Sequence, residues 1–293
     1  MLSRAMVVGC AVLLWGTAAP GAEVPQNSGP SCTPAGSLVR LADLPEASGL
    51  AVSRTVPGRL WTHNDSGAPV LFAFDAKGKP QGRVTLTGAT VEDWEALAIG
   101  PCAAGSCLYV GDIGDNDAKR HHVTIYRLAE PARLDGPVPV TDVFTATYPD
   151  GAHDAESLLV AADGRLMIVT KGETGAVGLY RFPRELRTGT MMRLERVGNP
   201  ISQKAGAAGR ITDATISADG KWVVLRTRIA VTFYSATEFL RGEFRESGRI
   251  DLAPLGEPQG EAVAFGPGGN LYVAGEGGGK KQPGTLAALA CRN

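Results

Sequence analysis

The sequence has no excess of charge of either sign. Its 29 Lys and Arg residues nearly balance its 30 Asp and Glu residues, which leaves a formal net charge of −1. A protein that binds nucleic acid through the phosphates usually carries a basic surface. We therefore expect no nucleic-acid partner.

Long apolar runs are also missing. The run from Ala5 to Trp15 is shorter than the roughly 20 residues that cross a membrane as a helix, and no later run is long enough. We expect no membrane span. Convincing helical stretches are few, whereas 38 Gly and 19 Pro residues make this 293-residue chain rich in turns. This composition favours a single all-β domain.

The same apolar run predicts where the protein goes. Arg4 precedes it, and the small residues of "GTAAPGA" at 16–22 follow it. A basic residue, a short apolar run and small residues in this order are typical of a cleaved signal peptide. We predict a signal peptide at 1–22, an N-terminal lead-in at 23–36 and the folded domain at 37–293. The mature protein is then secreted or periplasmic.

Cysteine is scarce, and one of the five residues, Cys10, lies in the expected signal peptide. An even count of four remains, which in an exported chain is typical of disulfide bonds. Cys102 and Cys107 flank the short turn "AAGS", and Cys32 and Cys291 lie near the two ends of the mature chain. We predict the pairs Cys32–Cys291 and Cys102–Cys107. The alternative for Cys102 and Cys107 is a metal site.

Internal repeats indicate the fold. Five segments share an acidic or hydroxyl residue, an alternating apolar strand and then a turn, at 46–53, 93–101, 154–164, 211–220 and 259–269. Two or three further strand-like stretches follow each of them. Four antiparallel strands at intervals of 47 to 61 residues are typical of propeller blades.

The fifth repeat contains only three strands. The segment "SLVRLADL" at 37–44 can supply the fourth, which would close the ring and bring Cys32 close to Cys291. We predict a five-bladed β-propeller with four antiparallel strands per blade, closed by the N-terminal strand. Six blades are the alternative.

Acidic residues recur at the start of the repeats. One column of the repeat alignment contains Ser48, Glu95, Glu156, Asp213 and Glu261, and a column two residues earlier contains Glu46, Asp93, Asp154, Ile211 and Gln259. Residues two apart on a strand point to the same side, and the first strand of each blade lines the central channel. Seven carboxylates therefore converge there: Glu46, Asp93, Glu95, Asp154, Glu156, Asp213 and Glu261.

A bound cation would relieve the repulsion among these acids. All seven are oxygen ligands, which favours a hard ion, and Ca²⁺ accepts about 6–8 oxygens with flexible geometry. We predict that the seven carboxylates bind Ca²⁺. In the alternative interpretation they cap turns at a solvated rim and bind nothing.

The second strand of each blade ends where the first begins, so its last residues lie at the same mouth. We assign catalytic roles to Asp112, Asp115 and Lys171. We assign substrate binding to Asn64, Asp65, Asn116, Arg226 and Arg228. The stretches "HNDSG" and "GDIGDN" also have the composition of ordinary turns, which is the alternative for them.

The forms "EASGLAVS…HNDSG", "DWEALAIGP…LYVGDIGDN" and "DAESLLVAADGRLMIVTKGE" resemble secreted bacterial propellers of the phytase-like and esterase-like group. They are also similar to the calcium-activated nucleotidases, which are five-bladed propellers with calcium in the channel. The repeat pattern of the blades covers residues ~37–290, but only the first three blades contain these motifs. The resemblance implies channel calcium and hydrolysis of phosphate esters or anhydrides.

Two classes of function follow. One is a calcium-dependent hydrolase of a small phosphorylated or anionic molecule, in which the ion polarises an oxygen and an acid activates water. The other is a non-catalytic propeller that binds a ligand or a protein and uses calcium structurally. In both cases we expect a monomer.

Overall fold

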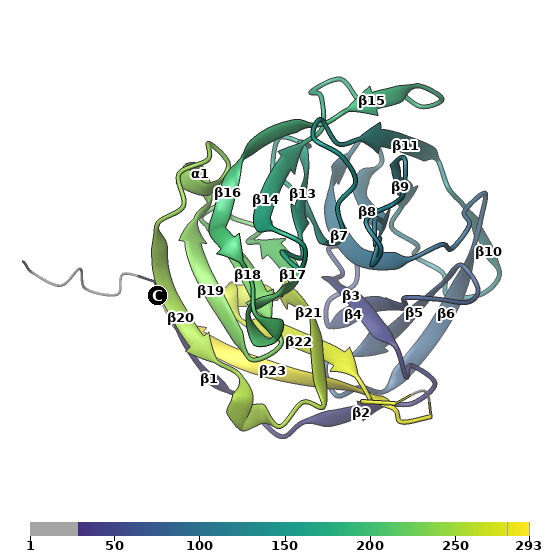
Figure 1. Cartoon of the computed structure of the whole chain (residues 1–293). Coiled ribbons are helices and arrows are strands. Elements are labelled where there is room, and N and C mark those ends of the chain that lie inside the picture. Colours follow the sequence, from purple (N-terminus) through teal and green to yellow (C-terminus); the bar gives the residue numbers. More distant parts are fainter. Residues whose placement is uncertain (1–28, 280, 293) are drawn as a thin grey trace, which may run out of the picture.

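The computed structural model describes residues 29–279 and 281–292. The expected signal peptide and the first part of the lead-in lie outside these residues. Five small sheets surround one axis (Figure 1). Their innermost strands pack against one another in a closed cycle, in the order β3 (Ala47–Val52), β7 (Trp94–Cys102), β12 (Ala155–Val160), β17 (Ile211–Ile216) and β21 (Gln259–Phe265). The five-bladed propeller is confirmed, and the six-bladed alternative is wrong.

Blades 1 and 2 each have a fifth strand that the repeat pattern did not predict. A short strand from the chain of the following blade reaches back and pairs parallel with the outer edge, β10 on β6 and β15 on β11. Blade 1 comprises β3, β4 (Arg59–Asn64), β5 (Val70–Asp75), β6 (Pro80–Thr87) and β10 (Pro137–Pro139). Blade 2 comprises β7, β8 (Gly105–Asp112), β9 (Val123–Ala129), β11 (Asp142–Thr147) and β15 (Met191–Arg193).

Blades 3 and 4 have the expected four strands. Blade 3 comprises β12, β13 (Leu166–Thr170), β14 (Ala176–Arg181) and β16 (Glu195–Lys204). Blade 4 comprises β17, β18 (Trp222–Thr227), β19 (Ala230–Ser235) and β20 (Glu246–Asp251). The helical elements are single turns, α1 (Ala236–Phe239), η1 (Ala207–Gly209), η2 (Ala253–Leu255) and η3 (Pro267–Gly269). Among the described residues no helix has the length and hydropathy to cross a membrane.

The N-terminal part of the chain closes blade 5, as predicted. This blade comprises β21, β22 (Leu271–Glu276), β23 (Gly284–Arg292), β1 (Ser31–Pro34) and β2 (Val39–Leu41). Two short strands, rather than one at 37–44, pair antiparallel with β23, and the first of them starts inside the expected lead-in. Cys32 lies opposite Cys291 in this pairing, and the two form a disulfide with a Cα–Cα distance of 4.1 Å.

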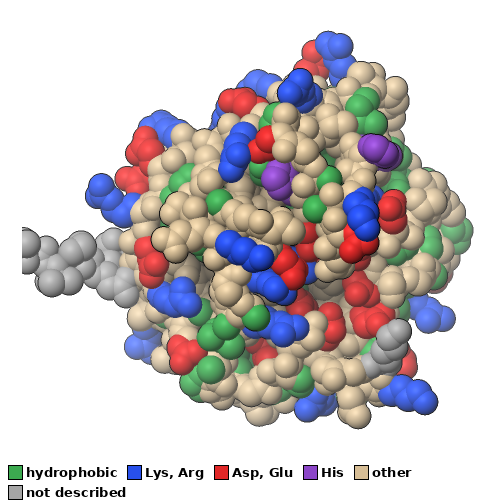
Figure 2. All heavy atoms as spheres, in the orientation of Figure 1, with side chains coloured by type: hydrophobic (Ala, Val, Ile, Leu, Met, Phe, Trp, Pro, Cys, Tyr) green, Lys and Arg blue, Asp and Glu red, His purple; other side chains and the backbone are tan. Residues whose placement is uncertain are grey.

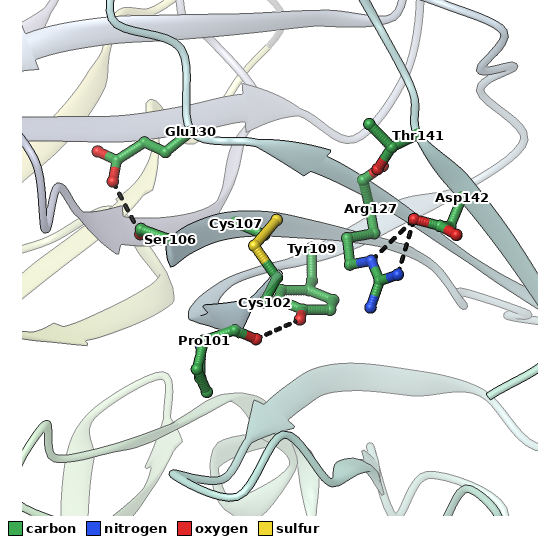
Figure 3. The surroundings of a disulfide bond; sticks show 9 residues. All are labelled: Pro101, Cys102, Ser106, Cys107, Tyr109, Arg127, Glu130, Thr141 and Asp142. Atoms are coloured by element: carbon green, nitrogen blue, oxygen red, sulfur yellow. Dashed lines mark hydrogen bonds and ion pairs between the residues drawn. A yellow bond between two sulfur atoms is a disulfide. The ribbon is translucent and has the colours of Figure 1, made fainter. Parts of the chain in front are cut away.

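The second disulfide is also confirmed and excludes a metal site at these sulfurs. Cys102 and Cys107 are bonded across the tip of the β7–β8 hairpin (Figure 3). Nearby, the Tyr109 hydroxyl donates to the carbonyl of Pro101 at 2.9 Å. The hairpin lies away from the beginning of β7, so this disulfide has no direct role at the channel mouth.

The hydrophobic core is divided into five clusters, one between each pair of neighbouring blades. Strand β8 shows why the sequence forms these layers. Leu108 and Val110 pack toward blade 1, and the alternate residues Cys107 and Tyr109 pack toward blade 3. Because both faces of the middle strands are buried, they appear in the sequence as nearly continuous apolar runs. This packing presents the starts of all five inner strands at one end of the channel.

Candidate functional site

One residue of each inner strand is displaced from the ladder near the start of the strand. The pairing with the second strand shifts register by one residue in all five blades, at Glu95, Glu156, Thr212 and Glu261 and, in blade 1, across Ser48 and Gly49, of which Ser48 carries the polar side chain. Such a β-bulge re-aims the side chain of the extra residue. Four of these residues line a single pocket, and the hydroxyl of the fifth, Ser48, donates to Glu95 Oε2 at 3.1 Å. We call these five residues the channel ring.

The ring corrects the alignment of blade 4. Asp213, which the sequence placed among the calcium ligands, pairs with Arg226 in the ladder and lies outside the pocket. Its carboxylate accepts the backbone N–H groups of Val263, at 2.7 Å, and Ala214, at 2.8 Å. Asp213 therefore joins blade 4 to blade 5, and the pocket receives the Thr212 side chain instead.

The same shift of one residue puts Arg210, rather than Ile211, at the position before the strand. A local signal could have shown this. Glu156 lies seven residues before Asp163 of the turn "AADG", and Thr212 lies seven residues before Asp219 of the similar turn "SADG". The repeat alignment puts the acidic Asp213 in this column, whereas the spacing to the turn matches Thr212. The result is that blade 4 contributes a hydroxyl and two arginines to the mouth, and no acid.

The ring lies at the base of a pocket of about 330 Å³ with a mostly charged lining. Figure 2 shows acidic side chains gathered near the middle of this face, beside Lys and Arg side chains. The lining consists of Asp65, Glu95, Asn116, Glu156, Lys171, Glu173, Ala207, Arg210, Thr212, Arg228, Gln259, Glu261 and Glu276. Seven of the residues predicted from the sequence are therefore brought together here.

Burial and mutual repulsion disfavour ionisation of the ring acids. Desolvation, followed by the charges of Glu156 and Asp93, raises the pKa of Glu95 well above its usual value. Burial raises the pKa of Glu156 to about 8, with Glu261 adding to the effect and Lys171 opposing it. Burial also raises the pKa of Glu261. The ring is thus a cluster of carboxylates that are costly to ionise without an added positive charge.

Two further acids of the pocket wall behave in the same way. Burial, then the charge of Glu261, raises the pKa of Glu276 to about 7. Burial, then Glu46, raises the pKa of Asp65 to about 6. Both carboxyls therefore titrate near neutral pH, which suits a group that exchanges protons.

Lys171 is the basic residue that contacts a carboxylate of the channel ring. Its Nζ contacts Glu156 Oε1 and lies 3.2 Å from Asp154 Oδ2. Burial alone would lower the pKa of Lys171, but the charges of Glu156 and Asp154 outweigh it, and the net shift is upward. A lysine side chain thus occupies part of the position in which the sequence predicted only a metal ion.

The remaining predicted metal ligands lie around the ring but not in it. Asp154 Oδ1 accepts the backbone N–H of Asp115 at 2.8 Å, which joins blades 2 and 3. Glu46 accepts the hydroxyl of Ser66 at 2.9 Å. Asp93 is partly buried, and desolvation, followed by Asp154, raises its pKa.

Asp112 and Asp115, predicted as catalytic, hold loop backbone instead. Asp112 is 2% exposed and accepts the backbone N–H groups of Glu92 and Asp93 and a bond from Arg120 Nη1 at 2.8 Å. Asp115 accepts the N–H groups of Lys119 and Arg120 at 2.9 and 2.7 Å. Neither lines the pocket, because Asp112 binds the segment that precedes β7 and both carboxylates bind the loop that follows β8.

The two arginines predicted to bind substrate lie in different environments. Arg228 follows the last residue of β18, is exposed and lines the pocket. Arg226 is fully buried between blades 4 and 5, where it donates to the carbonyl of Ala274 at 2.9 Å and pairs with Glu257 at 2.6 Å. The structure therefore does not bring Arg226 to the pocket with Arg228.

Asn64 and Asn116 also differ in role. Asn64 Oδ1 accepts the backbone N–H of Glu46 at 3.3 Å and holds the start of blade 1, away from the pocket. Asn116 lines the pocket, with its Oδ1 3.5 Å from Lys171 Nζ.

A first prediction concerns pH. The raised pKa values of Glu156 and Glu276 mean that the folded protein holds protons which the unfolded chain has lost, so this contribution to stability disappears as pH rises through about 7 to 8. His63, whose pKa burial lowers to about 4, opposes this only below about pH 6.5, where the unfolded chain binds the proton. In chelator, the melting temperature should therefore fall between about pH 6.5 and pH 8.5. Glu156→Gln should flatten the curve; an equal slope in that variant would contradict the assignment.

A second prediction separates the arginines. Arg226→Met leaves Glu257 buried without its partner, and removal of one member of a buried ion pair costs about 3–5 kcal/mol. Arg228→Met changes an exposed side chain and should alter the free energy of unfolding by no more than about 0.5 kcal/mol. Urea denaturation of the two variants measures both values. Similar stabilities would show that Arg226 is not structural.

Comparisons with known proteins support the fold and leave the activity open. No protein-family model matches the chain, and no curated protein matches its sequence. Aldose sugar dehydrogenase from Streptomyces coelicolor, solved with PQQ bound, is similar over 90% of this chain and 99% of its own, with a TM-score of 0.55 and 11% identity. The soluble aldose sugar dehydrogenase from Escherichia coli, in its apo form, matches over 90% of this chain and 100% of its own, with a TM-score of 0.51 and 15% identity. Neither is a phytase or a nucleotidase, and at these identities the likeness is one of fold.

Proposed function

We propose that the channel ring binds Ca²⁺. The observation that carries the proposal is the bulge that repeats in all five blades and presents one oxygen-bearing side chain each time. Ser48, Glu95, Glu156, Thr212 and Glu261 together offer three carboxylates and two hydroxyls. A hard cation with flexible coordination, such as Ca²⁺, suits this all-oxygen set.

The polar atoms of the ring fit such an ion. Thr212 is 5% exposed, and its Oγ1 is buried without a hydrogen-bond partner in the described structure. A buried hydroxyl without a partner is costly, and a cation would use its oxygen. Among the ion pairs of the described residues, only that of Lys171 with Glu156 reaches a ring carboxylate. Burial opposes ionisation of the three acids, and Ca²⁺ would supply the positive charge that favours their ionised form.

The ring is not preassembled. Within residues 29–279 and 281–292, no three Asp, Glu, His or Cys side chains lie together closely enough to form a metal site. Only three of the five ring members are carboxylates; these repel one another, and Lys171 contacts Glu156. Binding would draw the three acids together.

We further propose that the pocket above the ring binds a small anionic molecule and hydrolyses a phosphate ester or anhydride. Arg228 and Lys171 supply positive charge on the pocket wall. The resemblance of the first three blades to phytase-like propellers and calcium-activated nucleotidases favours a phosphoryl group as the anion. Ca²⁺, when bound, would polarise a phosphoryl oxygen. Glu276, with its pKa near 7, replaces Asp112 and Asp115 as the group that would take a proton from water.

A non-catalytic ligand-binding propeller is the second candidate. The specific observation in its favour is that both acids assigned to catalysis from the sequence accept backbone N–H groups, Asp112 those of Glu92 and Asp93 and Asp115 those of Lys119 and Arg120. In that case Ca²⁺ would hold the five blades together, and the pocket would bind its ligand without chemistry.

We also propose that the protein is exported and acts as a monomer. Disulfide bonds form and persist in oxidising compartments, and both pairs are present. Cell fractionation that finds the chain only in the cytoplasm would contradict export.

The calcium proposal predicts the effects of two ring substitutions. Glu95→Gln keeps the volume but removes a charge and should weaken Ca²⁺ binding by roughly tenfold or more, equivalent to ~1.4 kcal/mol. Thr212→Val removes a neutral ligand and should weaken it less. Glu173→Gln, in the same pocket but outside the ring, is the control and should stay near wild type. Isothermal titration and thermal melts measure the effects, since Ca²⁺ at a hundredfold excess over Kd adds ~2.7 kcal/mol of stability.

The hydrolase proposal predicts calcium-dependent phosphate release from phosphomonoesters or pyrophosphate. Release should stop with chelator and fall at least about tenfold in Glu276→Gln, while Ca²⁺ binding by that variant remains within about threefold of wild type. If the wild-type protein binds Ca²⁺ and releases no phosphate from any compound of such a panel, the non-catalytic propeller is correct.

A further inference from the structure

Lys171 connects the channel ring to the outer pocket. It follows the last residue of β13, and its side chain is 17% exposed. The ammonium contacts Glu156, a ring member, and two groups outside the ring, Asp154 at 3.2 Å and Asn116 at 3.5 Å. The amine of Lys171 therefore contacts both a ring carboxylate and polar groups outside the ring.

A cation in the ring would compete with this amine. The contacted atom, Glu156 Oε1, is buried and has no hydrogen-bond partner among the described residues, so Lys171 supplies its compensation. A divalent ion bound by Glu95, Glu156 and Glu261 would take over that role and would repel the ammonium at short range. The divalent ion and the ammonium of Lys171 cannot both bind Glu156 Oε1.

The displaced amine has a place to go. Asp154 and Asn116 remain beside it, and the pocket of about 330 Å³ lies on the same side. Arg228 lines that pocket and makes no ion pair within the described residues, whereas Arg210 is held by Glu173 at 2.7 Å. Released from Glu156, Lys171 would join Arg228 in facing the space above the ring, and two cations there suit a small dianion such as a phosphoryl group.

We propose that Lys171 is an exchangeable counterion that couples calcium binding to anion binding. Without calcium it neutralises Glu156. With calcium it turns to the pocket and binds the phosphoryl group of the ligand. This inference rests on the proposed calcium site. Because linkage is reciprocal, calcium tightens anion binding by the same factor by which the anion tightens calcium binding.

The test compares Lys171→Met with wild type in calcium titrations, with the metal alone as the probe. Removal of the competing charge should tighten Ca²⁺ binding, by about 5- to 150-fold if the coupling has the usual size. Lys171→Arg keeps the charge and should resemble wild type. Lys119→Met, at a side chain that is 77% exposed, is the control and should change nothing.

Two further measurements hold even if Lys171→Met folds poorly. In wild type, calcium should raise the rate at which an amine-reactive reagent modifies Lys171 several-fold, with Lys119 as the internal reference in the same mass spectrum. Inorganic phosphate should bind to wild type more tightly in the presence of calcium, and in folded Lys171→Met this dependence should be weaker, because only the direct attraction between ion and anion remains.

The outcomes separate the two proposals. If wild type binds no Ca²⁺ at millimolar concentration, both the calcium site and the proposed role of Lys171 as an exchangeable counterion are wrong. If wild type binds Ca²⁺ but folded Lys171→Met binds it equally well or less tightly, the exchange alone is wrong. Unchanged modification of Lys171 on calcium addition would also overturn it.

Discussion

Closure of the ring is the constraint on which the rest of the molecule depends. Each of the five hydrophobic clusters lies between two neighbouring blades, so no blade has a complete core by itself. Blade 5 provides three strands from the C-terminal part of the chain, and β1 and β2 complete it from the other end. The Cys32–Cys291 disulfide joins the two ends across 259 residues of sequence, and a link across so long a loop strongly restricts the unfolded chain.

Closure has an electrostatic consequence. It brings the starts of five inner strands to one narrow opening, and the bulge in each strand turns a polar side chain toward it. Three of these are carboxylates, which repel one another and resist ionisation. The structure relieves part of this repulsion with Lys171, and blade 4 relieves more by contributing Thr212, Arg210 and Arg228 in place of acids.

The polar residues around the opening therefore divide into two sets. One set is consumed by the fold: Asp112, Asp115, Asp154 and Asp213 bind loop backbone or join neighbouring blades, and Arg226 lies in the interior. The other set faces the pocket and is free to meet a ligand, with Glu276 and Arg228 on its wall and the ring at its base. The proposed cation and anion sites are built on the second set, which contains both acidic and basic side chains.

The sequence predicted five blades, with six as the alternative, and it predicted the position of every inner strand and both disulfides. These follow from local signals, namely apolar alternation, turns of Gly, Asp and Asn, and cysteines near the points that must meet. It also indicated that acids gather in the channel. Which residues face the pocket could not be predicted in this way, because a bulge moves one residue out of the two-residue period that the alignment assumed. That shift exchanged Asp213 for Thr212. The end of β18 at Thr227 also leaves Arg226 in the core and Arg228 in the pocket. Residues two apart on one strand would point to the same side, so their spacing in the sequence did not distinguish them.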